Sequence, residues 1–63
     1  MFSQVHFNYT FTIKVHDDSY SQIYTIDAQS KNEALQEAIE LFRDEFDKHG
    51  GDLTASIVSY ERS

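Results

Sequence analysis

The residues best suited to chemistry in this 63-residue chain are acidic side chains that recur every three or four positions. In a helix, at about 100° per residue, these carboxylates fall within an arc of roughly 80° and recur every ~4.5–6 Å along the axis. The sequence therefore predicts a continuous line of negative charge on one helix face. We call it the acidic stripe, and its members are Glu33, Glu37, Glu40, Asp44 and Asp47.

The acidic stripe has an ordinary interpretation, a solvated helix face, and a functional one. Its charges oppose helix formation, because like charges four residues apart, such as Glu33 and Glu37, repel each other. Asp44 and Asp47 also fall near the expected C-terminus, where the helix dipole disfavours each anion by about 0.3–1 kcal/mol. We therefore interpret the stripe as a surface for a basic partner, with charges spaced broadly like the phosphates of a nucleic-acid backbone.

The histidines and glycines do not form a second reactive centre. His6 and His16 are ten residues apart on one expected strand, about 33 Å at strand rise, so they cannot share a metal ion. His49 suits a helix C-terminus, and Gly50-Gly51 follows a helix, whereas a phosphate-binding loop precedes one. No catalytic triad or metal-ligand spacing is present. We expect no metal, no other cofactor and no enzymatic activity.

Composition narrows the class of partner. Eleven acidic residues against five basic ones give a net charge of −6, which argues against direct binding of nucleic acid. The chain has no cysteine and no apolar run near the ~20 residues of a membrane span. We expect one domain over residues 1–63, without membrane binding, in the cytoplasm.

Three strands and one helix are predicted to position the stripe. Residues 5–16 alternate between apolar and polar types, which indicates a strand with one buried face. A second strand over residues 20–28 follows after a short turn, so the two should form an antiparallel hairpin. A third strand is expected over residues 53–61, and both of its faces are partly apolar, so either could face the helix.

The helix between the second and third strands has its own start and stop signals. Ser30 and Glu33 match a capping box, and Gly50-Gly51 supplies a C-terminal stop after His49. The inner face carries apolar residues at helical spacing, flanked by Ala34 and Leu41. The expected inner residues are Leu35, Ala38, Ile39, Phe42 and Phe46.

These elements predict an α+β fold of two layers in the order β-β-α-β. A strand-helix-strand unit crosses over right-handed and leaves its two strands parallel. The first strand, antiparallel to both, then lies between them in a three-stranded sheet of order 2-1-3. The helix covers the aromatic face of this sheet, and the opposite face stays open.

The open sheet face is a second candidate interface. We expect it to carry the polar positions of the first strand together with three apolar residues from the neighbouring strands. The members are His6, Asn8, Thr10, Thr12, Lys14, His16, Ile23, Val58 and Tyr60. This face or a strand edge would support an alternative function, that of a small dimeric regulatory module similar to an antitoxin.

Residues 24–34, Tyr-Thr-Ile-Asp-Ala-Gln-Ser-Lys-Asn-Glu-Ala, with Ala38 four positions on, resemble a strand-to-helix pattern common in small phage and mobile-element proteins. Some of those proteins, including several anti-CRISPR proteins, are acidic single-domain inhibitors that block a nucleic-acid-handling complex. The resemblance implies a non-catalytic inhibitor that acts in the cytoplasm of a host cell. No site residue of this chain can be assigned from the resemblance.

Overall fold

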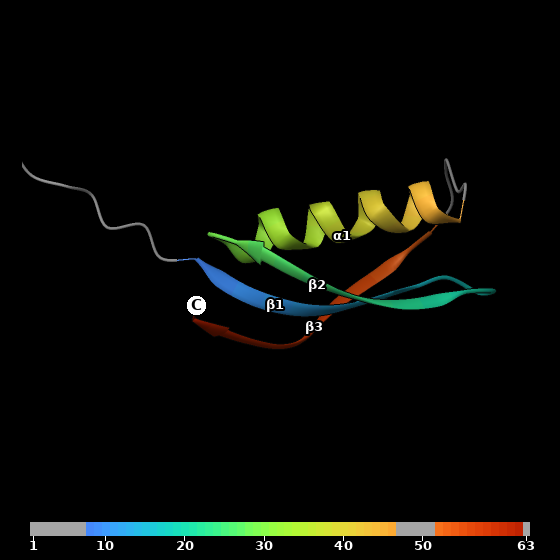
Figure 1. The fold of residues 1–63 in the computed structure, drawn as a ribbon. Coiled ribbons are helices and arrows are strands. Elements are labelled where there is room, and N and C mark those ends of the chain that lie inside the picture. The colour runs from blue at the N-terminus through green and yellow to red at the C-terminus, as the bar shows by residue number, and fades with distance from the viewer. Residues whose placement is uncertain (1–7, 47–51, 63) are drawn as a thin grey trace, which may run out of the picture.

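The alternating segment at the start of the chain forms the central strand of the sheet. The computed structural model describes residues 8–46 and 52–62, in the order β1 (Tyr9–His16), β2 (Ser21–Ala28), α1 (Lys31–Glu45) and β3 (Thr54–Arg62). β1 pairs antiparallel with both neighbours, so the sheet order is β2-β1-β3 and α1 lies over one face (Figure 1). The α+β layout predicted from the sequence is confirmed.

Some predicted features lie outside the described residues. The start of the first strand, with His6, is one of them. Asp47 of the acidic stripe, His49 and the Gly50-Gly51 stop are the others. Within the described part, α1 ends at Glu45 and Phe46 is its C-terminal cap, with the Phe46 N–H donating to the Phe42 carbonyl at 3.0 Å.

Side-chain caps set the two turns that define the hairpin and the helix. One carboxylate oxygen of Asp17 accepts from the backbone N–H groups of Ser19 at 2.7 Å and Tyr20 at 2.6 Å. At the helix start, the Ser30 hydroxyl accepts from the Glu33 N–H at 3.2 Å, as the capping box predicts. The reciprocal bond from the Ser30 N–H to the Glu33 carboxylate is not made, so only half of the box forms.

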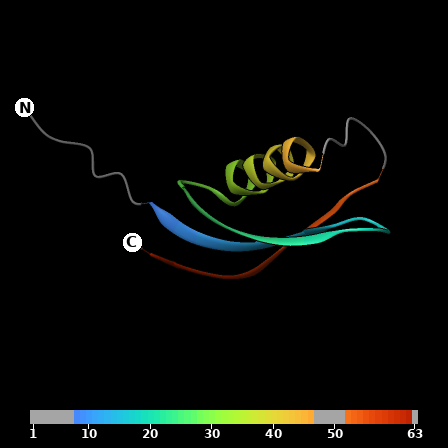
Figure 2. The same ribbon diagram turned by 45° about the vertical axis from the view of Figure 1, so that its right-hand side comes forward.

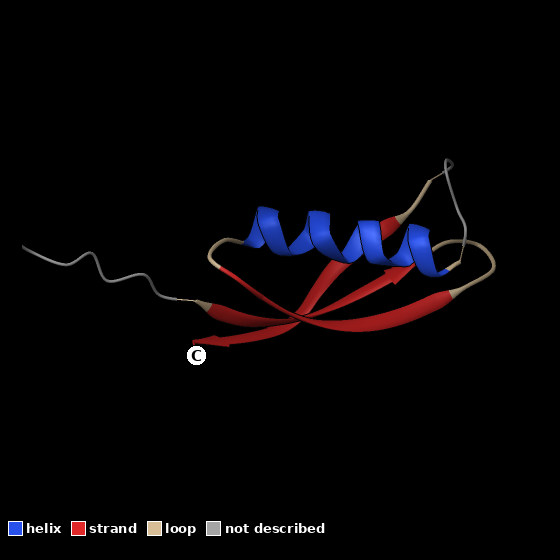
Figure 3. Cartoon of the chain, turned by 45° about the horizontal axis from the view of Figure 1, so that its top comes forward, coloured by secondary structure: helices blue, strands red, loops and turns tan. Residues whose placement is uncertain are grey.

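The core lies between α1 and the covered face of the sheet. Its fully buried residues are Phe11, Ile13, Val15, Ile26, Ala34, Ala38 and Phe42. Ala34 was expected on a flank and is buried, whereas Leu35 and Ile39 are only partly buried. The buried face of the helix is therefore centred on Ala34, Ala38 and Phe42, and the small alanine side chain allows close packing against the strands. The three strands twist beneath the helix, and no described element covers the opposite face (Figures 2 and 3).

A β-bulge in β3 decides which of its residues face the helix. Ile13 pairs with Ile57 and Thr12 with Ser59, so Val58 is an extra residue in the strand. Before the bulge, Ala55 and Ile57 pack against the core. After the bulge, Tyr60 pairs with Phe11 and so faces the helix side as well. The expectation that Tyr60 belongs to the open face is wrong, since the bulge reverses the alternation of the strand.

Candidate functional site

The described members of the acidic stripe lie on the solvent side of α1. Glu33, Glu37, Glu40 and Asp44 are all exposed, opposite the buried inner face of the helix. At 1.5 Å per residue, positions 33 to 44 cover about 16 Å of the helix axis. None of the four carboxylates makes a hydrogen bond or ion pair with any described residue. The structure therefore brings four of the five predicted residues together as unengaged charges.

Glu45 is the exception among the acidic residues of α1. Its two carboxylate oxygens accept hydrogen bonds from the Tyr24 hydroxyl at 2.6 Å and from Gln22 Nε2 at 3.1 Å. Both donors lie on β2, so Glu45 holds the last turn of the helix to the sheet. Helical spacing places Glu45 three residues after the buried Phe42, but only the fold shows that Gln22 and Tyr24 meet its carboxylate. The four described carboxylates of the stripe, by contrast, bond to no described residue.

The Tyr24 hydroxyl has a raised pKa. Burial raises its pKa from 10.0 to about 12, with further contributions from the hydrogen bond to Glu45 and from the charge on Glu45. A phenol that keeps its proton remains a donor to the carboxylate.

We expect the free energy of unfolding to decrease as pH rises from about 10 toward 12. The folded protein retains the Tyr24 proton over this range, whereas the unfolded chain, with a pKa near 10.0, loses it. The stabilisation is complete below pH 10 and is lost as pH approaches 12. Urea titrations across this window should show a steeper decrease for the parent chain than for Tyr24→Phe, which has no proton to release. Identical pH dependence in the two proteins would show that Tyr24 is not linked to folding.

The open sheet face is mostly polar at its centre. Ile23 and Val58 are exposed, at 57% and 59%, but lie on the two outer strands with β1 between them. Thr10 Oγ1 donates to the Asp27 carboxylate across this face at 2.8 Å. With Tyr60 on the other side, two separated apolar residues remain, and isolated exposed apolar side chains are ordinary on protein surfaces.

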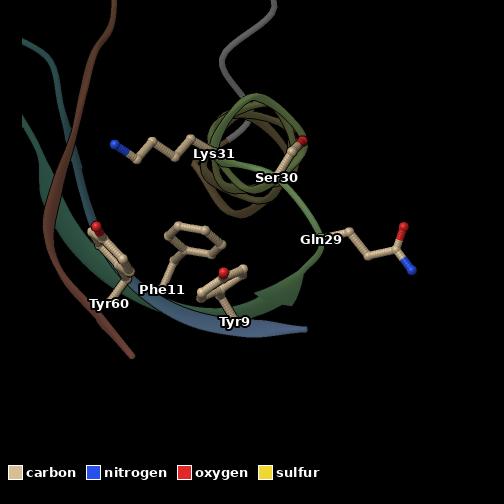
Figure 4. Close-up of a pocket in the computed structure, with 6 residues that line it drawn as sticks. All are labelled: Tyr9, Phe11, Gln29, Ser30, Lys31 and Tyr60. Carbon is tan, nitrogen blue, oxygen red and sulfur yellow. The ribbon is translucent and has the colours of Figure 1, made fainter. Parts of the chain in front are cut away.

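The bulge creates a small pocket that sequence reasoning missed. It lies at the start of α1 and has a volume of about 260 Å³. Its lining residues are Tyr9, Phe11, Gln29, Ser30, Lys31 and Tyr60. Figure 4 shows the three aromatic rings together beneath the helix, while the Gln29 side chain points away. The sequence contains no signal that predicts this pocket, because the position of a β-bulge cannot be recognised from the amino-acid composition of the strand.

The contacts among the residues that line this pocket, and its small volume, favour a structural role. The Lys31 ammonium lies 5.4 Å from the centroid of the Tyr60 ring, and the Phe11 and Tyr60 rings are 5.6 Å apart. Its volume is below the ~300–1,000 Å³ typical of ligand pockets. These contacts secure the first turn of the helix and the end of β3.

The remaining candidate groups add no reactive centre. His16, the described histidine, ends β1, while His6 and His49 lie outside the described residues. Over residues 8–46 and 52–62, no group of three or more His, Cys, Asp or Glu side chains is placed to hold a metal ion. In the same residues, no helix has the length and apolar character needed to cross a membrane.

The fold and these surfaces define a small two-layer α+β domain with an acidic helix face. Comparisons with protein-family models, curated proteins and solved structures found no match to this chain.

Proposed function

We propose that this chain is a non-catalytic, acidic inhibitor that binds a basic surface of a larger protein or nucleoprotein complex. The observation that carries the proposal is the acidic stripe, in which Glu33, Glu37, Glu40 and Asp44 are exposed and engaged by no described residue. A helix whose surface served stability alone would place cations near its C-terminal end. Asp44 occupies that position instead, with Arg43 as the basic residue of the last turn.

The geometry of the stripe suits a surface that normally binds nucleic acid. Its charges follow one helix face over about 16 Å, so a groove lined with lysine and arginine could contact several of them at once. A basic groove of this kind binds phosphates in the same way, mainly through electrostatics. The chain would then compete with nucleic acid for the groove.

The proposed setting is a phage or mobile element, with the inhibitor acting as an anti-CRISPR-like protein in the host cytoplasm. The resemblance of residues 24–34 to small phage proteins supports this setting, and the net charge of −6 supports the class of partner. No cofactor is required for such a function.

Reversal of two stripe charges tests the proposal. In bacteria that carry an active RNA-guided nuclease, we expect the parent chain to protect a targeted plasmid. We expect the Glu40→Lys/Asp44→Lys variant to lose protection by about tenfold or more, because like charges placed together at an interface cost several kcal/mol. Counts of surviving transformants, over a panel of nuclease types, measure the effect.

A matched control separates the stripe from net charge. The Asp18→Lys/Glu61→Lys variant changes the net charge by the same amount at two exposed residues outside the helix. We expect it to protect the plasmid as the parent does. Equal activity of the stripe variant and the parent, with the fold verified by circular dichroism, would contradict the proposal. So would partner binding that does not weaken as salt rises.

A further inference from the structure

The two edges of the sheet differ in how well they are protected against pairing with another strand. The outer strand β3 contains the bulge at Val58 and ends in the charged residues Glu61 and Arg62. Bulges and charges are the usual means of protecting an edge. β2 pairs with β1 in unbroken register over all eight residues, has no proline, and carries the single charge Asp27. The β2 edge is therefore the open one.

The backbone groups that β2 turns outward can be assigned from its register. The Asp17 N–H donates to the Tyr20 carbonyl at 2.9 Å, which makes this the first hydrogen-bonded pair of the hairpin. Hydrogen-bonded and non-hydrogen-bonded pairs then alternate along the two strands, so Ile23 and Thr25 direct their N–H and C=O groups away from β1. In agreement, the Ile23 N–H donates to Gln22 Oε1 at 3.2 Å. No described side chain accepts from the Thr25 N–H.

Exposed apolar side chains lie beside this edge in both layers. Ile23, 57% exposed, projects from β2 on the open face, where it pairs with Lys14. Leu41, 44% exposed, lies one turn before Glu45 on α1. Because Glu45 is bonded to β2, Leu41 lies on the β2 side of the helix. A strand added at this edge would therefore extend the backbone ladder and also cover Ile23 and Leu41.

We propose that the β2 edges of two copies of this chain pair antiparallel around Thr25. The product is one continuous six-stranded sheet with both helices on the same face. A second copy fits because a two-fold axis at Thr25 places the outward N–H and C=O groups of one β2 opposite those of the other. Small domains without disulfides often gain stability by association, and this chain has 63 residues and no cysteine. The described residues of the acidic stripe lie on the solvent side of α1, away from the β2 edge, so the dimer does not rest on the proposed function.

Proline at Thr25 tests the pairing. A proline removes only the outward N–H of an edge strand, so the monomer should tolerate Thr25→Pro. Thr25→Val is the matched control, because it retains the N–H. By sedimentation equilibrium over a range of protein concentrations, we expect the parent and the valine variant to dimerise. We expect the proline variant to dimerise about tenfold or more weakly, since each copy loses a backbone hydrogen bond.

A second variant and a salt series keep the test decisive if the proline variant does not fold. Ile23→Glu changes an exposed residue that pairing around Thr25 aligns with Asp27 of the other copy, so two carboxylates would face each other and dimerisation should weaken to a similar degree. Because each chain carries a charge of −6, dimerisation should strengthen as salt rises, the opposite of binding through the stripe. A parent that is monomeric at every concentration and salt level overturns the proposal. A dimer that both variants leave unchanged also overturns it.

Discussion

Replacing Phe42 with alanine is expected to lower the free energy of unfolding by about 3–5 kcal/mol, the largest effect of any substitution considered. Phe42 is fully buried on the inner face of α1 and packs against Phe46, with ring centroids 4.7 Å apart. Alanine would lose the burial of the ring and leave a cavity between the helix and the sheet. A domain of this size has a total stability near the lower end of the usual 5–15 kcal/mol, so much of the variant should be unfolded.

Urea denaturation followed by circular dichroism measures this loss. Gln36→Ala is the control on the same helix, because Gln36 is exposed and alanine favours the helix. The control should be as stable as the parent or slightly more stable. A loss below about 1 kcal/mol for Phe42→Ala would contradict the packing of α1 on the sheet.

Replacing Ala38 with leucine is expected to lower the free energy of unfolding by about 1–3 kcal/mol, through overpacking. Ala38 is fully buried in the core between the helix and the strands, together with Ala34. A larger side chain would force the helix away from Phe11 and Ile13 and disturb the rest of the core. Leucine is more hydrophobic than alanine, so a hydrophobicity scale alone predicts that the substitution stabilises the protein. A decrease in the free energy of unfolding would therefore indicate overpacking of the core.

Gln36→Leu provides the matched control for this substitution. It adds a leucine on the exposed side of the same helix, where no strand is near. Comparing the urea midpoints of the two variants isolates the effect of the close contact. If Ala38→Leu stabilised the protein, the helix would have room above the sheet and the alanine-based packing would be wrong.

The two proposed surfaces are compatible with each other. In the proposed dimer, both helices lie on one face of the sheet, and their acidic stripes remain on the solvent side. Two stripes would then be displayed to a basic partner, which raises apparent affinity when both can bind at once. The salt dependences of dimerisation and partner binding have opposite signs, so the two events can be separated in one set of measurements.

Local patterns in the sequence determined the elements of this protein and their order. The alternation of residues 9–15 indicated β1, and the Ser30 cap with the spacing of Ala38 and Phe42 indicated α1. These patterns are readable because each depends on residues close in the chain. The order β2-β1-β3 also followed from the sequence, since short connections and right-handed crossovers leave few alternatives. The exposed side of the helix, and with it the acidic stripe, followed from helical periodicity.

Tertiary structure alone decided the face of Tyr60, the pocket beside it and the structural role of Glu45. The extra residue Val58 is accommodated by the pairing of β3 with β1, and pairing between distant segments is set by packing, which no local pattern records. Glu45 differs from Asp44 because β2 presents Tyr24 and Gln22 to it. The sequence determined which residues carry negative charge, and the fold decided which of the described carboxylates bond within the protein, as Glu45 does, and which are exposed without such a bond, as Glu40 and Asp44 are.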